Sequence, residues 1–354
     1  MKKPIILNLA VASLTVLLVF VLQRCGWIRI GILSGEPVVV TAKTLTPGIT
    51  YDLPAQTPPK NLLTTIESIT DDDARSQAID AAVASIADAD RPEFLTLLSS
   101  HDSPSAEELR ALLVRRWAES NPAAAAAWLV QIPNGPAYRA ALKQVAIAWA
   151  DKDLAGATAW LATLPAGANQ QSATLDVAYE AAATEPLTAL KLAGSLPASP
   201  ERNDLLAFTV SQWTATNPTD AIAWAKQVTS APLRQQLLAA VSVALAAQNG
   251  ASAAALAGTA LTPGSAQDRV AVSIVQRWAQ TAPQEAANWV AQFPEAPVRY
   301  AAAQNLLTLW TPQNATTAAS WLNALPPGTT RVVGTIAYTN ALASLNSSYA
   351  EPTP

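Results

Sequence analysis

Apolar residues recur at helical spacing along most of the chain, in short runs separated by polar breaks. A representative run covers residues 138–150 and places apolar side chains on one helical face, at Leu142, Val145, Ala146 and Trp149. After a polar break at 151–153, a second run carries Trp160 and Leu164 four residues apart and ends at Pro165. Each helix has roughly 11–13 residues, too few to be stable alone, so each must bury its apolar stripe against neighbours.

Tryptophan shows that this unit is repeated. Ten of the eleven Trp fall into two columns separated by 11 residues, namely Trp117, Trp149, Trp213, Trp278 and Trp310, and then Trp128, Trp160, Trp224, Trp289 and Trp321. The intervals in the first column are 32, 64, 65 and 32 residues, which gives a period of 32 with two copies lacking Trp. Those copies fall at Ala181 with Leu192 and at Leu245 with Leu256. We therefore expect seven copies over 105–345 and a weaker eighth in 64–104.

The residues between the two Trp columns predict where the first helix of each unit ends and the second begins. Several copies open the second helix with Asn-Pro, as at Asn121-Pro122, because Asn is a good N-cap and Pro suits the first helical position. Alanine runs allow close helix approach, with one large Trp per helix to fill the remaining space. The sequence thus predicts an all-α fold, a right-handed or curved α-solenoid of about seven to eight helical hairpins. A first cap is expected at 71–88 and a last helix at 331–345.

The spacing W-x4-P-x5-W-x4-P, seen at Trp117, Pro122, Trp128 and Pro133, supports a resemblance to known repeats. It resembles the repeats of uncharacterised membrane-anchored bacterial proteins, and the hairpin unit resembles tetratricopeptide, Sel1-like and HEAT-like solenoids, here with an atypical 32-residue period. The resemblance covers about two-thirds of the chain. It implies a fold and assigns no catalytic or binding residue.

The N-terminus predicts a membrane anchor. Residues 4–22 carry no charge and follow Met1-Lys2-Lys3. As a helix they would be roughly 28 Å long, close to the hydrocarbon thickness of a bilayer. The following residues lack the small side chains of a signal-peptidase site, which favours an uncleaved signal anchor over the alternative of a secreted protein after cleavage. We expect a single-pass protein of the inner (cytoplasmic) membrane with its repeats in the periplasm.

These features divide the chain into five parts. They are an anchor and flank at 1–33, a Pro-rich linker at 34–62, N-terminal capping helices at 63–104, the repeat solenoid at 105–345 and a disordered tail at 346–354.

The composition argues against several classes of function and of site. Only 14 % of residues are charged and the net charge is −4, which argues against a nucleic-acid-binding surface. A single cysteine, Cys25, and a single histidine, His101, argue against a disulfide framework and against metal sites built from Cys or His. We expect no cofactor, no metal and no enzymatic activity.

A basic residue recurs near the start of the first helix of most copies. The six positions are Arg139, Arg202, Arg234, Arg269, Arg299 and Arg331. A cation there opposes the helix dipole, so something else must favour it. It either stacks on a Trp or pairs with an acid, or the row forms a ladder of guanidinium groups that grips an acidic partner segment.

Three functions follow from these observations. The favoured one is a non-enzymatic, membrane-tethered scaffold that presents its repeat surface to a protein partner. The second is a cell-envelope glycan-binding or structural protein that uses exposed aromatic rings. The third is a helical enzyme with carboxylates on loops, for which the scattered candidates are Asp151, Asp153, Glu180 and Glu201.

Overall fold

The computed structural model describes residues 59–98, 100–101 and 103–349, and this part of the chain contains eighteen α-helices and no strand. The prediction of an all-α chain is confirmed for these residues. The expected anchor at 4–22 and nearly all of the linker lie outside them. None of the described helices combines the length and the apolar character needed to cross a membrane.

Helices of two lengths alternate through most of the described chain. The long helices have 14–17 residues and are α5 (Pro104–Ser120), α7 (Pro136–Lys152), α9 (Ala168–Thr184), α11 (Pro200–Thr216), α13 (Ala231–Leu245), α15 (Ser265–Trp278) and α17 (Pro297–Gln313). The short helices have 8–11 residues and are α6 (Pro122–Leu129), α8 (Leu154–Leu161), α10 (Pro186–Ser195), α12 (Pro218–Gln227), α14 (Gly250–Ala260), α16 (Pro283–Val290) and α18 (Ala315–Ala324). Before and after them lie α2 (Pro59–Glu67), α3 (Asp72–Ser85), α4 (Arg91–Leu98) and α19 (Thr329–Tyr349).

The expectation of two helices of similar length was wrong. A short helix such as α8 ends at Leu161, four residues before Pro165. The following long helix gains residues because Pro is often among its first residues, as Pro136 is in α7. A long helix that begins at Pro therefore includes N-terminal residues that the pattern of apolar positions did not predict to be helical.

Two predicted segment boundaries also differ from those in the structure. Helix α2 begins at Pro59, inside the range 34–62 that was expected to be linker. Helix α19 continues to Tyr349, into the range 346–354 that was expected to be a tail. No Gly or Pro interrupts the sequence between Thr335 and Tyr349, which is consistent with a helix that runs past residue 345.

One residue both ends each long helix and begins the next short one, except in the α13–α14 and α15–α16 pairs, where a short turn precedes it. Its backbone N–H donates to the carbonyl four residues earlier, at 2.7–2.9 Å, in all seven long–short pairs. The donors are Asn121, Asp153, Glu185, Asn217, Asn249, Ala282 and Asn314. The acceptors are the first-column positions, including Ala181 and Leu245 where Trp is absent. The same bond therefore recurs every 32 residues, and once after 33, in a repeat-like all-α arrangement.

Five of these junction residues also cap the short helix with their side chains. The Oδ1 of Asn217 accepts from Asp220 N at 3.1 Å, whereas Glu185 caps no backbone amide of α10. Replacing Asn217 by Ala is expected to lower the free energy of unfolding by about 1 kcal/mol, because an amide at the start of α12 loses its acceptor. Urea unfolding followed by circular dichroism measures the change. Glu185→Ala is the matched control, and an equal loss there would contradict the capping role.

The paired Trp of one hairpin pack on each other. Ring centroids lie 6.1 Å apart for Trp117 and Trp128, and 5.3 Å apart for the stacked rings of Trp149 and Trp160. The corresponding distances are 6.1 Å for Trp278 with Trp289 and 6.3 Å for Trp310 with Trp321. All ten column Trp are buried or half-buried. In these four hairpins the ring pair fills the space between the long and the short helix.

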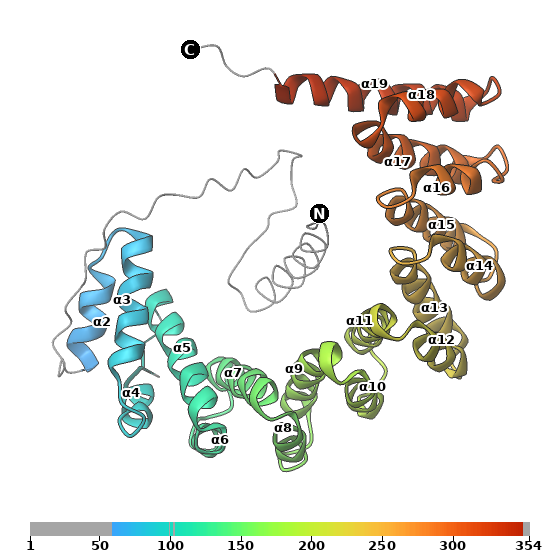
Figure 1. Cartoon of the computed structure of the whole chain (residues 1–354). Coiled ribbons are helices and arrows are strands. Elements are labelled where there is room, and N and C mark those ends of the chain that lie inside the picture. The colour runs from blue at the N-terminus through green and yellow to red at the C-terminus, as the bar shows by residue number, and fades with distance from the viewer. Residues whose placement is uncertain (1–58, 99, 102, 350–354) are drawn as a thin grey trace, which may run out of the picture. The chain divides into compact units, whose positions relative to one another are not determined.

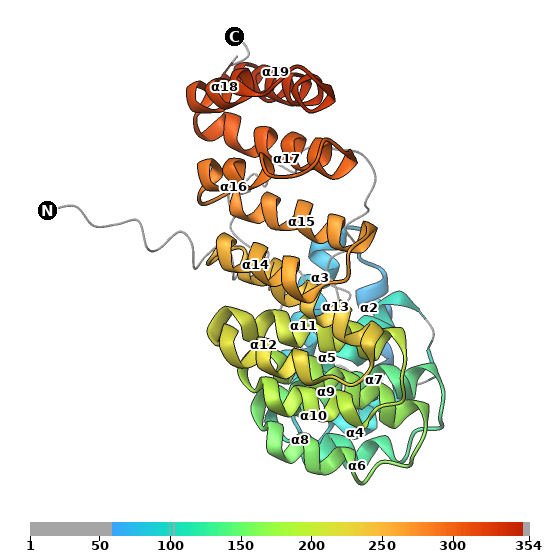
Figure 2. The same ribbon diagram turned by 90° about the vertical axis from the view of Figure 1, so that its right-hand side faces the viewer.

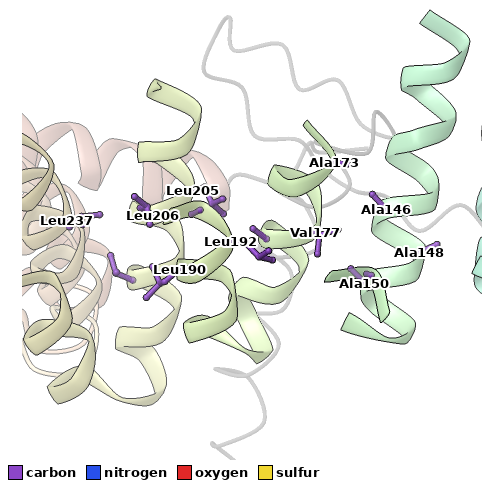
Figure 3. Close-up of a cluster of buried hydrophobic side chains, with 14 of the residues drawn as sticks. Ala146, Ala148, Ala150, Ala173, Val177, Leu190, Leu192, Leu205, Leu206 and Leu237 are labelled. Atoms are coloured by element: carbon purple, nitrogen blue, oxygen red, sulfur yellow. The ribbon is translucent and has the colours of Figure 1, made fainter. Parts of the chain in front are cut away.

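Small and branched aliphatic residues fill the space between hairpins. Figure 3 shows such residues of α7, α9, α10 and α11, among them Ala146, Val177, Leu192 and Leu205. Ala146, Val177 and Leu205 are fully buried. Small side chains at these positions allow neighbouring helices to approach closely.

Each hairpin packs against the next one along the chain. Every long helix from α7 to α17 contacts the long helix before it and the one after it, and each short helix packs on its own long helix and on the following one. Figure 1 shows the helices following each other in chain order, and Figure 2 shows α14 to α19 as successive tiers. The long helices therefore lie side by side and share one surface.

Polar side chains join successive hairpins at the ends of the long helices. Lys152 Nζ donates to the carbonyls of Glu119 and Ser120 at 3.0 and 2.8 Å, and Gln313 Nε2 donates to Ala279 O at 2.9 Å. The last carbonyls of a helix have no partner within that helix. The next repeat supplies one, which fixes the register between neighbours.

Candidate functional site

The six arginines of the predicted ladder all lie in the first turns of long helices, or of α19, as expected. Three of them bind the end of the preceding short helix. These bonds are Arg202 Nε to Ala193 O at 3.1 Å, Arg234 Nη1 to Val228 O at 2.8 Å and Arg331 Nη1 to Leu325 O at 3.2 Å. A cation at this position is therefore favoured because it satisfies carbonyls at the negative end of the previous helix.

The other three arginines differ from each other. Arg299 Nη1 lies 3.4 Å from Glu295 Oε2, so it pairs with an acid. The pKa of Glu295 is held below its ordinary value, chiefly because Thr330 N donates to this carboxylate. Arg139 and Arg269 are exposed. Of the predicted row, these two guanidinium groups are the most accessible to a partner.

The sequence analysis did not predict that glutamine can replace arginine as the donor to carbonyls of the preceding short helix. Gln170 Nε2 donates to Leu161 O at 3.0 Å, and Gln267 Nε2 donates to Ala257 O at 3.0 Å. In α15 this role falls to Gln267, and Arg269 two residues later is exposed. The recurring feature is a long donor in the first turn, for which charge is not required. The signal in the sequence was the matching position of Gln and Arg relative to the junction residue.

A second row of residues lies on the shared surface of the long helices. Ile147 of α7, Tyr179 of α9 and Val243 of α13 occupy equivalent positions, 32 and 64 residues apart, and all three are half-buried. In α11 this position is held by Ser211. Phe208 of α11 is also half-buried, and its ring centroid lies 5.5 Å from that of Tyr179. We call these four residues the central long-helix face. The equivalent positions further out are polar, with Arg115 in α5 and Gln276 in α15.

An acidic residue adjoins the centre of this face. The pKa of Glu180 is raised above its ordinary value, first by burial and then by the negative charges of Asp151 and Asp176, while Arg115 acts in the opposite direction. Burial and nearby like charges both disfavour the ionised form. A further cation placed beside Glu180 would therefore stabilise its ionised form, which burial and the two neighbouring acids disfavour.

The raised pKa of Glu180 predicts a pH-dependent stability. Folding raises the pKa of this carboxyl, so the folded chain holds the proton more tightly than the unfolded chain. Stability is therefore expected to fall as the pH rises from the ordinary value of 4.5 through the raised pKa. Glu180→Gln should weaken that fall and raise the thermal midpoint at pH 7 by on the order of 1 °C. Thermal unfolding at pH 4 to 8 measures both effects. Glu108→Gln, on the exposed surface of α5, should leave the pH profile unchanged, and a profile unaffected by Glu180→Gln would contradict this account.

The remaining candidate residues have local roles. Asp153 Oδ1 accepts from Gly156 N at 2.9 Å and so caps α8. Glu201 is exposed, and hydrogen bonds hold its pKa below the ordinary value. His101 Nδ1 lies 3.1 Å from Leu97 O in the connection between α4 and α5. In the described part of the chain, no three His, Cys, Asp or Glu residues gather where they could hold a metal ion.

Comparisons with known proteins found no relative of this chain. Comparison with protein-family models, with curated proteins and with solved structures gave no significant match. The residues on the long-helix surface therefore carry the functional argument.

Proposed function

We propose that this chain is a non-enzymatic, membrane-tethered scaffold, an α-solenoid whose long helices bind a protein partner. One observation carries the proposal. Ile147, Tyr179 and Val243 are half-buried apolar residues at equivalent positions of α7, α9 and α13, and the half-buried Phe208 comes from α11 between them. The equivalent residues of α5 and α15, Arg115 and Gln276, are polar. Apolar and aromatic residues clustered at the centre of a polar surface are typical of protein-binding sites.

The central long-helix face also indicates the chemistry of the partner. Apolar side chains of the partner would pack on Ile147, Tyr179, Phe208 and Val243. A lysine or arginine beside them would pair with Glu180, whose ionised form is disfavoured by burial and by Asp151 and Asp176. The exposed Arg139 and Arg269 would contact acids at the margin of the same partner. We therefore propose a partner segment with an apolar core and a central basic residue.

The proposed tether explains how such a scaffold would find its partner. The 25 residues at 34–58, between the proposed anchor and α2, include four prolines. In an extended polyproline-like form such a linker would reach roughly 75 Å. An anchor at 4–22 would then let the repeats search the space next to the inner membrane for a partner.

Site-specific photocrosslinking in cells tests the proposal. A photoreactive amino acid replaces Ile147, Tyr179 or Val243 in the full chain, and the controls carry it at Ala127, Ala159 or Ala255, which are exposed on short helices. The three positions on the central long-helix face should give one common protein adduct, and the controls should not. Equal adducts from both sets, or none from the first set, would contradict the proposal.

The carboxylate-enzyme alternative has one observation in its favour. Glu180 and Asp151 come from neighbouring long helices, and the charge of Asp151 helps to raise the pKa of Glu180. A raised pKa is what a general acid needs. Hydrolysis of chromogenic glycosides by the purified chain, abolished by Glu180→Gln, would favour this second function. Absence of hydrolysis over pH 4 to 8 would count against it.

A further inference from the structure

The contact between α13 and α15 is the least extensive one between successive long helices from α5 to α19. The positions that face each other across such a contact can be read at α17 and α19. A Cβ added at Gly334 of α19 would lie 2.9 Å from Leu307 Cδ1 of α17. Counting back by repeats gives the equivalent facing pairs, Val114–Ala141, Ala146–Ala173, Ala178–Leu205, Val210–Leu237, Ser242–Val270 and Val275–Ala302.

The pair between α13 and α15 differs from all the others. Val270 is half-buried, whereas every other member of these pairs is buried. Ser242 is the one polar member, and its Oγ donates to Leu238 O of its own helix at 2.7 Å. The next residue, Ala271, is also half-buried, although the equivalent residues of the other long helices from α5 to α17 are buried. The two helices therefore cover each other incompletely.

A polar contact that joins other hairpins is also missing here. In three repeats the residue before the junction residue donates to the preceding hairpin, as Gln248 Nε2 does to Ala215 O at 2.8 Å. Thr281 holds this position after α15 and donates instead to Trp278 O of its own helix, at 3.3 Å. The repeats of α9 and α11 also have Thr there, but their facing pairs are buried. At α15 incomplete burial and the missing tie coincide.

Helix α14 holds α13 and α15 together on the opposite side. It packs on both long helices. The ring of Trp278 in α15 lies directly against Gly250 of α14, and Gln267 Nε2 of α15 donates to Ala257 O of α14 at 3.0 Å. Gln235 Nε2 of α13 donates to Ala260 O at the other end of α14, also at 3.0 Å. The short-helix side of this junction is therefore tied at several points.

We propose that the α13–α15 junction is a hinge whose axis lies along α14, so that α15 to α19 turn as one body and the long helices α13 and α15 part and close. In a repeat array each interface contributes its own stability, and the one with the fewest buried contacts yields first. Movement about a few tied residues is a common form of hinge motion. The central long-helix face belongs to α7–α13, on one side of the hinge, so this inference does not rest on the proposed partner.

Distances between paired spin labels test the hinge. The full chain in detergent micelles carries Cys25→Ser, which removes its single cysteine. Labels at Ser172→Cys and Arg269→Cys span three repeats across the hinge. Labels at Ala140→Cys and Gln236→Cys span three repeats on one side of it, and all four positions are exposed. The distance distribution across the hinge should be at least about twice as broad as the control distribution. Equal widths would overturn the proposal.

A substitution that fills the contact should restrict the hinge. Val270→Leu would place a large residue opposite the small Ser242, as Leu205 lies opposite Ala178. It should narrow the distribution across the hinge towards the control width and raise the thermal midpoint by about 1–2 °C. Val210→Leu is the matched control, because Val210 is fully buried and should not accept a further methylene. It should lower the midpoint by at least about 2 °C. A broad distribution that Val270→Leu leaves unchanged, or a loss of stability at both positions, would overturn the proposal.

Discussion

Replacing Trp310 by Ala is expected to lower the free energy of unfolding by about 3–5 kcal/mol. Trp310 is only 2 % exposed, and its ring centroid lies 6.3 Å from that of Trp321. Loss of the indole removes a large apolar surface and leaves a cavity where Trp310 of α17 packs on Trp321 of α18. Urea unfolding of the full chain, followed by circular dichroism, measures the loss.

Two controls separate this effect from a general sensitivity to mutation. Trp310→Phe keeps most of the apolar volume and should lose less than half as much. Val130→Ala, at a residue that is 86 % exposed, should be nearly neutral. Because contacts in a repeat array are local, hydrogen exchange should show the loss concentrated in α17 to α19. If Trp310→Ala cost less than about 1 kcal/mol, the Trp columns would not be core residues.

Replacing Gly250 by Ala is expected to cost about 2–3 kcal/mol, although alanine is the better helix former. A Cβ at this position would lie 1.9 Å from Trp278 Cδ2 and 2.2 Å from Trp278 Cγ. The ring of Trp278 is 6 % exposed and packs on Trp289 at 6.1 Å, so it has little room to move. The thermal midpoint of the full chain measures the change.

The control for Gly250 lies in the same helix. Gly258 of α14 is exposed, and a Cβ there meets nothing within 4 Å. Gly258→Ala should therefore raise stability by about 0.5–1 kcal/mol, because alanine loses less backbone entropy in a helix. Opposite signs at the two glycines support the close approach of Trp278 to α14. A gain at both positions would contradict it.

Much of the fold could be predicted because large residues mark it at regular intervals. The interval of 32 between Trp117 and Trp149 predicted the repeat, and counting from it placed Ala181 and Leu245 at the two Trp-less copies. The bond from Glu185 N to Ala181 O, equivalent to that from Asn121 N to Trp117 O, agrees with that placement. Counting succeeds here because Trp stands at the same position of the unit in five of the seven long helices.

The proposed binding surface could be predicted only in part. The arginine row was visible as a column, but the carbonyls that bind Arg202 and Arg234 belong to a preceding helix whose end the sequence did not fix. Ile147, Tyr179 and Val243 share a position and differ in residue type, so no column of letters marks them. Their half-buried setting depends on the packing of neighbouring long helices, which periodicity alone does not specify.

The shared junction residue has a consequence for how the length of this protein can vary. With one residue between α7 and α8, an insertion there would rotate the whole downstream part of the chain. Four residues separate α14 from α15, and the single 33-residue interval falls in that copy. Foreign peptides or labels should therefore be grafted into the connections that follow short helices, where the backbone can absorb them without disturbing the stack.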